Sequence, residues 1–150
     1  LCGDRSGVVY QCPPTLRIRM PCRSASLGMH CDADYARHEG AEINFWVPFT
    51  RAWGTNSLWA ESEPLRGDFR PFDVEAGVGV RFNGSRCRHY TRANDTGLTR
   101  VSIDFRVIPL SLWRNDWGGL IGDYATEVLA GPIDLVEDGG GTGPSDDAPG

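Results

Sequence analysis

The chain contains no lysine. All fifteen of its basic residues are arginines. This absence excludes the phosphate-binding lysine of Walker-type nucleotide sites, and it excludes the lysine that forms a Schiff base with a carbonyl substrate or with pyridoxal phosphate. Any anion that this protein binds must therefore be held by arginine, by backbone N–H groups or by a metal ion.

Cysteine is scarce and irregularly spaced. No C-x-x-C pair occurs, which excludes a zinc ribbon and a thioredoxin-type redox motif. The five cysteines are Cys2, Cys12, Cys22, Cys31 and Cys87. An odd number without a disulfide pattern predicts reduced thiols and a cytoplasmic location.

Long apolar runs are also missing. No stretch approaches the ~18 residues that a membrane span needs, and the N-terminus lacks the basic and apolar regions of a signal peptide. The net charge of −5 argues against a nucleic-acid partner, since nucleic acids select basic surfaces. We therefore expect a soluble protein with a small-molecule substrate. Its first residue is Leu1 rather than Met, which fits a processed or partial product that lacks an N-terminal segment.

Short β-rich segments fill the chain up to residue 110. They comprise residues 7–12, 15–20, 27–35, 41–50, 55–63, 77–84, 87–92 and 99–110, separated by Pro, Gly and Asn-Gly turn signals. Eight strands at this spacing predict an all-β fold, a double-stranded β-helix (a cupin-like jelly roll) with few helices, over residues 1–137. Residues 112–131 are expected to be partly helical, although their glycines disfavour a helix. Residues 138–150 have almost no apolar side chains and predict a disordered tail.

The sequence MHCDADY carries a histidine and an aspartate two residues apart. In an extended strand, His30 and Asp32 point to the same face, so the imidazole and the carboxylate lie side by side. A distant histidine, His89, lies in the β-rich segment 87–92. Two histidines and one carboxylate can occupy one face of Fe(II) and leave three positions open for O₂ and a co-substrate. An ordinary hydrogen bond within a strand pair explains the same spacing.

The segment RVSIDFRV alternates strictly between polar and apolar residues. Its polar face comprises Arg100, Ser102, Asp104 and Arg106, and its apolar face comprises Val101, Ile103, Phe105 and Val107. An outer strand with a solvent-facing polar side accounts for this pattern as well as a cavity-facing one does. If the polar side faces a cavity, Arg100 offers a fork-shaped cation to the far carboxylate of a co-substrate such as 2-oxoglutarate.

Three segments of the chain resemble the StrG proteins of streptomycin-type biosynthetic clusters. They are HCDADYARHEGAEINFWVPFTRAWGTNSLWAESEP, GDFRP and RHYTRANDTGLTRVSIDFRVIP. The StrG proteins in turn resemble Fe(II)/2-oxoglutarate-dependent oxygenases of the phytanoyl-CoA-hydroxylase type. The resemblance covers residues 27–110 and implies the same jelly-roll fold.

This resemblance assigns roles to individual residues. It implies that His30, Asp32 and His89 are the iron ligands and the catalytic residues. It implies that Arg100 binds the C5 carboxylate of 2-oxoglutarate and that the Thr91 hydroxyl assists. The residues that it implies to line the cavity are Asn44, Trp46 and Asn56.

The implied activity is hydroxylation or desaturation of a small natural-product intermediate, such as an amino sugar or a cyclitol, with Fe(II), 2-oxoglutarate and O₂. Two alternatives remain open. One is a cupin-like metalloenzyme that does not use 2-oxoglutarate. The other is a non-catalytic carbohydrate-binding jelly roll, favoured by exposed tryptophans and separated histidines. Asp34 and His38 are interpreted as surface-loop residues, and Cys87 as a neighbour of His89 rather than a ligand.

Overall fold

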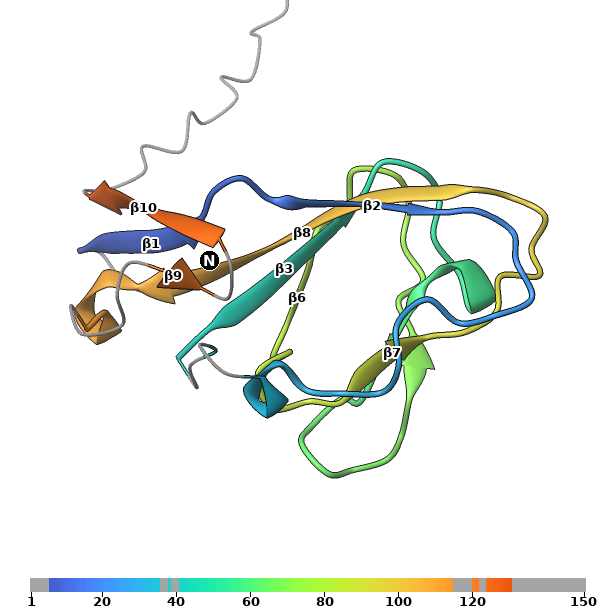
Figure 1. The fold of residues 1–150 in the computed structure, drawn as a ribbon, viewed down its shortest axis with the longest axis horizontal. Coiled ribbons are helices and arrows are strands. Elements are labelled where there is room, and N and C mark those ends of the chain that lie inside the picture. Colours follow the sequence, from blue (N-terminus) through green and yellow to red (C-terminus); the bar gives the residue numbers. More distant parts are fainter. Residues whose placement is uncertain (1–5, 36–37, 39–40, 115–119, 122–123, 131–150) are drawn as a thin grey trace, which may run out of the picture.

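A computed structural model describes residues 6–35, 38, 41–114, 120–121 and 124–130. Over these ranges the chain consists mainly of antiparallel strands in two sheets (Figure 1). The larger sheet contains β1 (Gly7–Gln11), β2 (Thr15–Arg19), β3 (Ile43–Pro48), β6 (Val80–Phe82), β8 (Arg100–Pro109), β9 (Leu120–Ile121) and β10 (Tyr124–Ala130). The smaller sheet contains β4 (Leu58–Ala60), β5 (Arg70–Pro71) and β7 (His89–Thr91). The predicted all-β jelly roll is confirmed.

The longest strand, β8, organises the larger sheet. Along one edge it pairs with β3, from Ile43↔Val107 to Pro48↔Ser102. Along its other edge, its first half pairs with β2 and its second half with β1. One strand therefore joins β3, β2 and β1 in this sheet, and it is the long arrow labelled β8 in Figure 1.

The inward face of β8 is polar. Arg100, Ser102 and Arg106 are buried, whereas the apolar residues between them are only half-buried. On the outer side, Phe105 stacks on Phe45 of β3. This arrangement reverses the usual pattern of an antiparallel sheet, in which apolar side chains face the core. A polar cavity between the sheets accounts for the reversal.

The smaller sheet carries His89. Strand β7 pairs with β4, where Ala60 lies opposite His89. An isolated antiparallel bridge then joins His89 to His30, with N···O distances of 2.8 and 3.2 Å. The hydrophobic cluster of Trp46, Ala52 and Leu58 packs nearby. The bridge thereby fixes the two histidines beside each other.

Three predicted elements are wrong. Residues 27–35 do not form a strand: the bridge at His30 is followed by the 3₁₀ helix η1 (Asp32–Asp34), whose backbone is held by another loop. Within 112–131, the described residues form β9 and β10 rather than helix, because β10 finds backbone partners along all of β1. Strand β5 arises inside an expected loop. The predicted tail, 138–150, lies outside the described residues.

Helical structure in the described residues is limited to short 3₁₀ turns. Besides η1, these are η2 (Gly54–Asn56) and η3 (Leu110–Leu112). None of the helices in these ranges has the length and apolar character that crossing a membrane requires.

Ile108 of β8 provides a test of the core. Its side chain is 1% exposed and it lies opposite the fully buried Val9. We expect Ile108→Ala to lower the free energy of unfolding by about 2–5 kcal/mol, because it leaves a cavity. Ile18, on β2, has a side chain that is 63% exposed. Ile18→Ala should therefore change the free energy of unfolding by about 0.5 kcal/mol or less. Urea denaturation of both variants measures the difference, and equal effects would contradict this description of the core.

Candidate metal centre

Three potential ligand atoms converge at one end of the space between the sheets. His30 Nε2 lies 3.6 Å from Asp32 Oδ1, and His89 Nε2 lies 3.5 Å from the same oxygen. The two imidazole rings are 4.3 Å apart between centroids. Atoms that share one ion at about 2.0–2.2 Å each lie no more than about 4.4 Å apart. The geometry therefore fits a single metal ion.

The hydrogen bonds of the two imidazoles define which nitrogens are free. His30 Nδ1 lies 2.9 Å from the Gly28 carbonyl oxygen, and His89 Nδ1 lies 3.1 Å from the Cys87 carbonyl oxygen. A carbonyl oxygen can only accept a hydrogen bond, so each Nδ1 carries the proton and donates it. In the neutral rings, both Nε2 atoms then direct lone pairs toward the Asp32 carboxylate. These three electron-rich atoms form a donor set that suits a cation.

The second carboxylate oxygen of Asp32 is held from another side. Asn44 Nδ2 donates to Asp32 Oδ2 at 2.7 Å, and Arg106 Nε donates to the same oxygen at 2.9 Å. Asp32 itself is 1% exposed. Burial alone would raise the pKa of this carboxyl, but contact with His30 and with the Arg106 guanidinium lowers it below its usual value. Asp32 is thus an ionised carboxylate whose free oxygen, Oδ1, faces both histidines.

The two histidines have different electrostatic surroundings. Contact with the Asp32 carboxylate raises the pKa of His30. Burial lowers the pKa of His89, so its imidazole stays neutral at neutral pH. A neutral imidazole is the form that binds metals.

A loop between β6 and β7 holds the η1 turn in place. The backbone N–H groups of Asp32 and Ala33 donate to the carbonyl oxygens of Gly84 and Ser85, at 2.9 and 3.2 Å. Gly84 also packs against Asn44: a Cβ atom there would lie 2.6 Å from the Asn44 amide. Adjacency of His30 and Asp32 was expected from strand geometry, but it arises from this anchored turn.

Asp34 does not join the cluster. Its Oδ2 accepts a hydrogen bond from the Cys31 backbone N–H at 2.9 Å, which closes the η1 turn. This contact distinguishes two acids that the MHCDADY motif leaves nearly equivalent.

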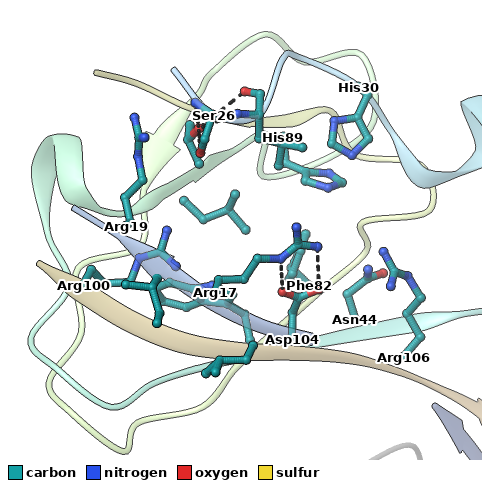
Figure 2. Close-up of a pocket in the computed structure, with 16 residues that line it drawn as sticks. Arg17, Arg19, Ser26, His30, Asn44, Phe82, His89, Arg100, Asp104 and Arg106 are labelled. Atoms are coloured by element: carbon teal, nitrogen blue, oxygen red, sulfur yellow. Dashed lines mark hydrogen bonds and ion pairs between the residues drawn. The ribbon is translucent and has the colours of Figure 1, made fainter. Parts of the chain in front are cut away.

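A cavity of about 310 Å³ extends from the histidines across the inward face of β8. Figure 2 shows His30 and His89 on one side of it, Asn44 and Arg106 at one end, and Arg19 and Arg100 at the other. Trp46 and Thr91 also line the cavity, whereas the lining does not include Asn56. Arg100 and Arg106 both point inward, which matches the alternation of the segment.

The Arg100 side chain is held by two neutral groups, and neither of them is a carboxylate. Its Nε donates to the Asn56 carbonyl oxygen at 3.0 Å, and its Nη1 donates to Ser102 Oγ. The guanidinium lies 5.3 Å from the centre of the Trp46 ring. Burial, together with the positive charge of Arg19, lowers the pKa of Arg100 to about 10, so the side chain remains a cation at neutral pH.

The Thr91 hydroxyl is partly committed to the protein. Its Oγ1 accepts hydrogen bonds from the backbone N–H groups of Ser26 and Leu27, at 3.2 and 3.0 Å. It lies 3.5 Å from the Leu27 carbonyl oxygen, a weak contact for its own proton. Oγ1 also lies 3.2 Å from Ser26 Oγ, so the hydroxyl of this buried cavity-lining residue already has several partners.

Two features of this region were not anticipated from the sequence. His38 is not a simple surface residue, since its Nδ1 lies 2.9 Å from Oε2 of the buried Glu42. Asp32, His38 and Glu42 also form a compact group of potential ligands. However, Arg106 Nε lies 2.9 Å from Asp32 and 3.7 Å from Glu42, so a guanidinium already supplies the positive charge there. The sequence signal for this group is limited to the four-residue spacing of His38 and Glu42.

Comparison with known proteins supports the resemblance. No family model matches the chain. The streptomycin biosynthesis protein StrG of Streptomyces griseus is 38% identical over 115 residues, which cover 76% of this chain and 54% of StrG. The chain thus spans about half the length of this curated relative.

Solved structures show a similar fold. The nickel complex of the non-heme monooxygenase ThoJ is 22% identical, with a TM-score of 0.54, over 69% of this chain and 45% of ThoJ. The apo form of ThoJ is 18% identical, with a TM-score of 0.55, over 69% of this chain and 47% of its own. The chain therefore resembles StrG in sequence, as its motifs predict, and shares the fold of ThoJ.

Proposed function

We propose that this protein is an Fe(II)/2-oxoglutarate-dependent oxygenase that hydroxylates or desaturates a small natural-product intermediate. One observation carries the proposal. The free Nε2 atoms of His30 and His89 converge on an ionised, fixed carboxylate oxygen of Asp32, at a cavity whose far end carries a buried arginine. This combination matches a metal that binds a bidentate, anionic co-substrate.

In this proposal, His30, Asp32 and His89 are the metal ligands. They occupy one side of the ion and leave the cavity side open. Bound iron and 2-oxoglutarate together supply the O₂ activation that amino-acid side chains cannot. For a hydroxylation, the balanced reaction converts substrate C–H, 2-oxoglutarate and O₂ into C–OH, succinate and CO₂.

The protein's own residues orient these components. Asn44 and Arg106 hold Asp32 Oδ2, so that Oδ1 stays directed at the ion. Arg100 is the proposed partner of the C5 carboxylate, because the described residues offer it no carboxylate within salt-bridge distance. The Thr91 hydroxyl is the proposed second donor. Cavity walls that include Trp46 and Phe82 exclude water from the reacting centre.

The substrate class rests on the similarity to StrG. A streptomycin biosynthesis protein acts in a route to an amino-sugar antibiotic, and an amino sugar or a cyclitol is the proposed substrate class. A cytoplasmic location is proposed because Cys22, Cys31 and Cys87 are thiols that form no disulfide with another described residue.

The alternatives receive less support. A carbohydrate-binding jelly roll needs exposed tryptophans and separated histidines, yet Trp46 is 2% exposed and the His30 and His89 rings are in contact. A metalloenzyme without 2-oxoglutarate leaves the buried cation of Arg100 unexplained.

The direct test compares Asp32→Ala with Asp34→Ala. Under anaerobic conditions, Fe(II) and 2-oxoglutarate should give the weak visible charge-transfer band of the iron chelate in the unmodified protein. We expect Asp32→Ala to lack this band, to bind less iron per chain and to form no succinate, because the substitution removes the anionic ligand. Asp34→Ala should keep all three, since the Asp34 carboxylate bonds to Cys31 of its own turn and does not belong to the group of potential ligands.

The two variants also control for folding. Loss of the η1 turn contact in Asp34→Ala should lower stability slightly, so thermal unfolding is recorded for both variants. Full iron occupancy in Asp32→Ala, or loss of iron only in Asp34→Ala, would overturn the ligand assignment.

Substitution of Gly84 tests whether Asn44 holds the ligand Asp32 in place. Gly84→Ala would drive a methyl group into the Asn44 amide and displace the donor that holds Asp32. We expect metal affinity to fall by about 10–100-fold, the usual effect of losing a hydrogen bond behind a metal ligand. Gly79→Ala is the matched control, because its new Cβ would lie 3.6 Å from Val47, an ordinary contact. Equal metal affinity in the two variants, measured by competition with a chromogenic chelator, would contradict this role of Asn44.

A further inference from the structure

Two arginines face each other across the strand pair β2–β8. In the antiparallel register, Arg19 lies directly opposite Arg100. Arg19 is 8% exposed and Arg100 is 3% exposed. Like charges directly opposite each other destabilise a sheet, and burial strengthens their repulsion by removing water. An arrangement of this kind calls for a compensating charge.

Among the described residues, that charge is provided only at longer range, by Asp104 of the same strand acting on Arg100. None of their carboxylates lies within salt-bridge distance of Arg19 or Arg100. Arg19 is instead positioned by neutral groups, with its Nη2 donating to the carbonyl oxygens of Ser24 and Arg92 at 2.7 and 2.6 Å. Its Nε is buried without a hydrogen-bond partner. A buried polar group without a partner is costly and rare in a folded protein.

The other two cavity arginines are different, because each has an acid. Arg17, on the same face of β2, is paired with Asp104 through Nε at 2.7 Å. Arg106 is paired with Asp32 at 2.9 Å. The unpaired positive charge is therefore concentrated at one end of the cavity, opposite Asn44 and Arg106, where Figure 2 shows Arg19 and Arg100 together.

We propose that Arg19 and Arg100 form a doubly cationic subsite for the distal carboxylate of a dicarboxylate, and that Arg19 makes this subsite select a carboxylate over a neutral group of similar shape. The identity of the dicarboxylate as 2-oxoglutarate rests on the proposed function, whereas the subsite itself rests only on the arginine pair. Arg19 is a specificity-determining residue that the H-x-D…H pattern and the position of Arg100 do not identify.

The test is a binding measurement on metal-free protein, so it needs no catalysis. Glutarate and its neutral diamide, glutaramide, are the probes, because they have the same carbon chain and differ in the charge of their end groups. By titration calorimetry, we expect glutarate to bind the unmodified protein at least about tenfold more tightly than glutaramide, a difference typical of one charge-assisted contact. Absence of this preference in the unmodified protein would overturn the proposal without any variant.

Variants separate the role of Arg19 from a structural one. Arg19→Gln should weaken glutarate binding by about tenfold or more and leave glutaramide binding unchanged. Arg17→Gln, two residues along the same face, should change glutarate affinity by less than about twofold, because Arg17 is already paired. Arg19→Lys restores the charge without the fork and should recover part of the lost affinity. Unchanged glutarate affinity in Arg19→Gln, or an equal loss in Arg17→Gln, would contradict the subsite.

The outcome is distinguishable from failure of the proposed function. If the Arg19→Gln variant forms succinate with an unchanged KM for 2-oxoglutarate, the subsite is wrong and the oxygenase proposal stands. Glutarate binding that depends on Arg19, in a protein that forms no succinate with iron, would support the subsite and reject the oxygenase proposal.

Discussion

The buried carboxylate of Asp32 is the group on which the candidate site depends. One of its oxygens faces two imidazole nitrogens, and the other accepts hydrogen bonds from Asn44 and Arg106. An ionised carboxylate is costly to bury unless it is paired and fully hydrogen-bonded. These donors offset that cost on one side and leave the other oxygen to attract a cation. Loss of Asp32 would therefore leave Arg106 without its closest acid as well as removing the ligand.

Charge is distributed unevenly along the cavity. At the histidine end, Arg106 is balanced by Asp32, with Glu42 nearby. At the far end, Arg19 and Arg100 have no such balance among the described residues. Because both arginines are buried, a bound ligand would feel this asymmetry strongly. A molecule with a metal-binding group at one end and a carboxylate at the other would satisfy both ends, which links the proposed metal centre to the proposed anion subsite.

Strand β8 couples the two ends. Arg100 and Arg106 are on the same face of a single strand, and the register of that strand is set by β3 on one edge and by β2 and β1 on the other. A one-residue slip would turn every polar side chain of β8 outward and bring Phe105 into the cavity. The stacking of Phe45 on Phe105 outside the sheet opposes such a slip. The same strand therefore provides both the frame of the sheet and the spacing of its cations.

Local patterns in the sequence determined most of the strands, the polar face of β8 and the residues of the candidate metal centre. Alternation with a period of two is a local property, so it can be read without knowing the fold. The tertiary structure decided the rest. The η1 turn replaces the second half of the expected strand because Gly84 and Ser85 accept hydrogen bonds from the backbone of Asp32 and Ala33, and the sequence MHCDADY alone does not reveal those partners. Likewise, strand register places Arg19 opposite Arg100, and packing between distant segments brings Arg106 to Asp32. Register and packing are non-local, so they cannot be inferred from either segment alone.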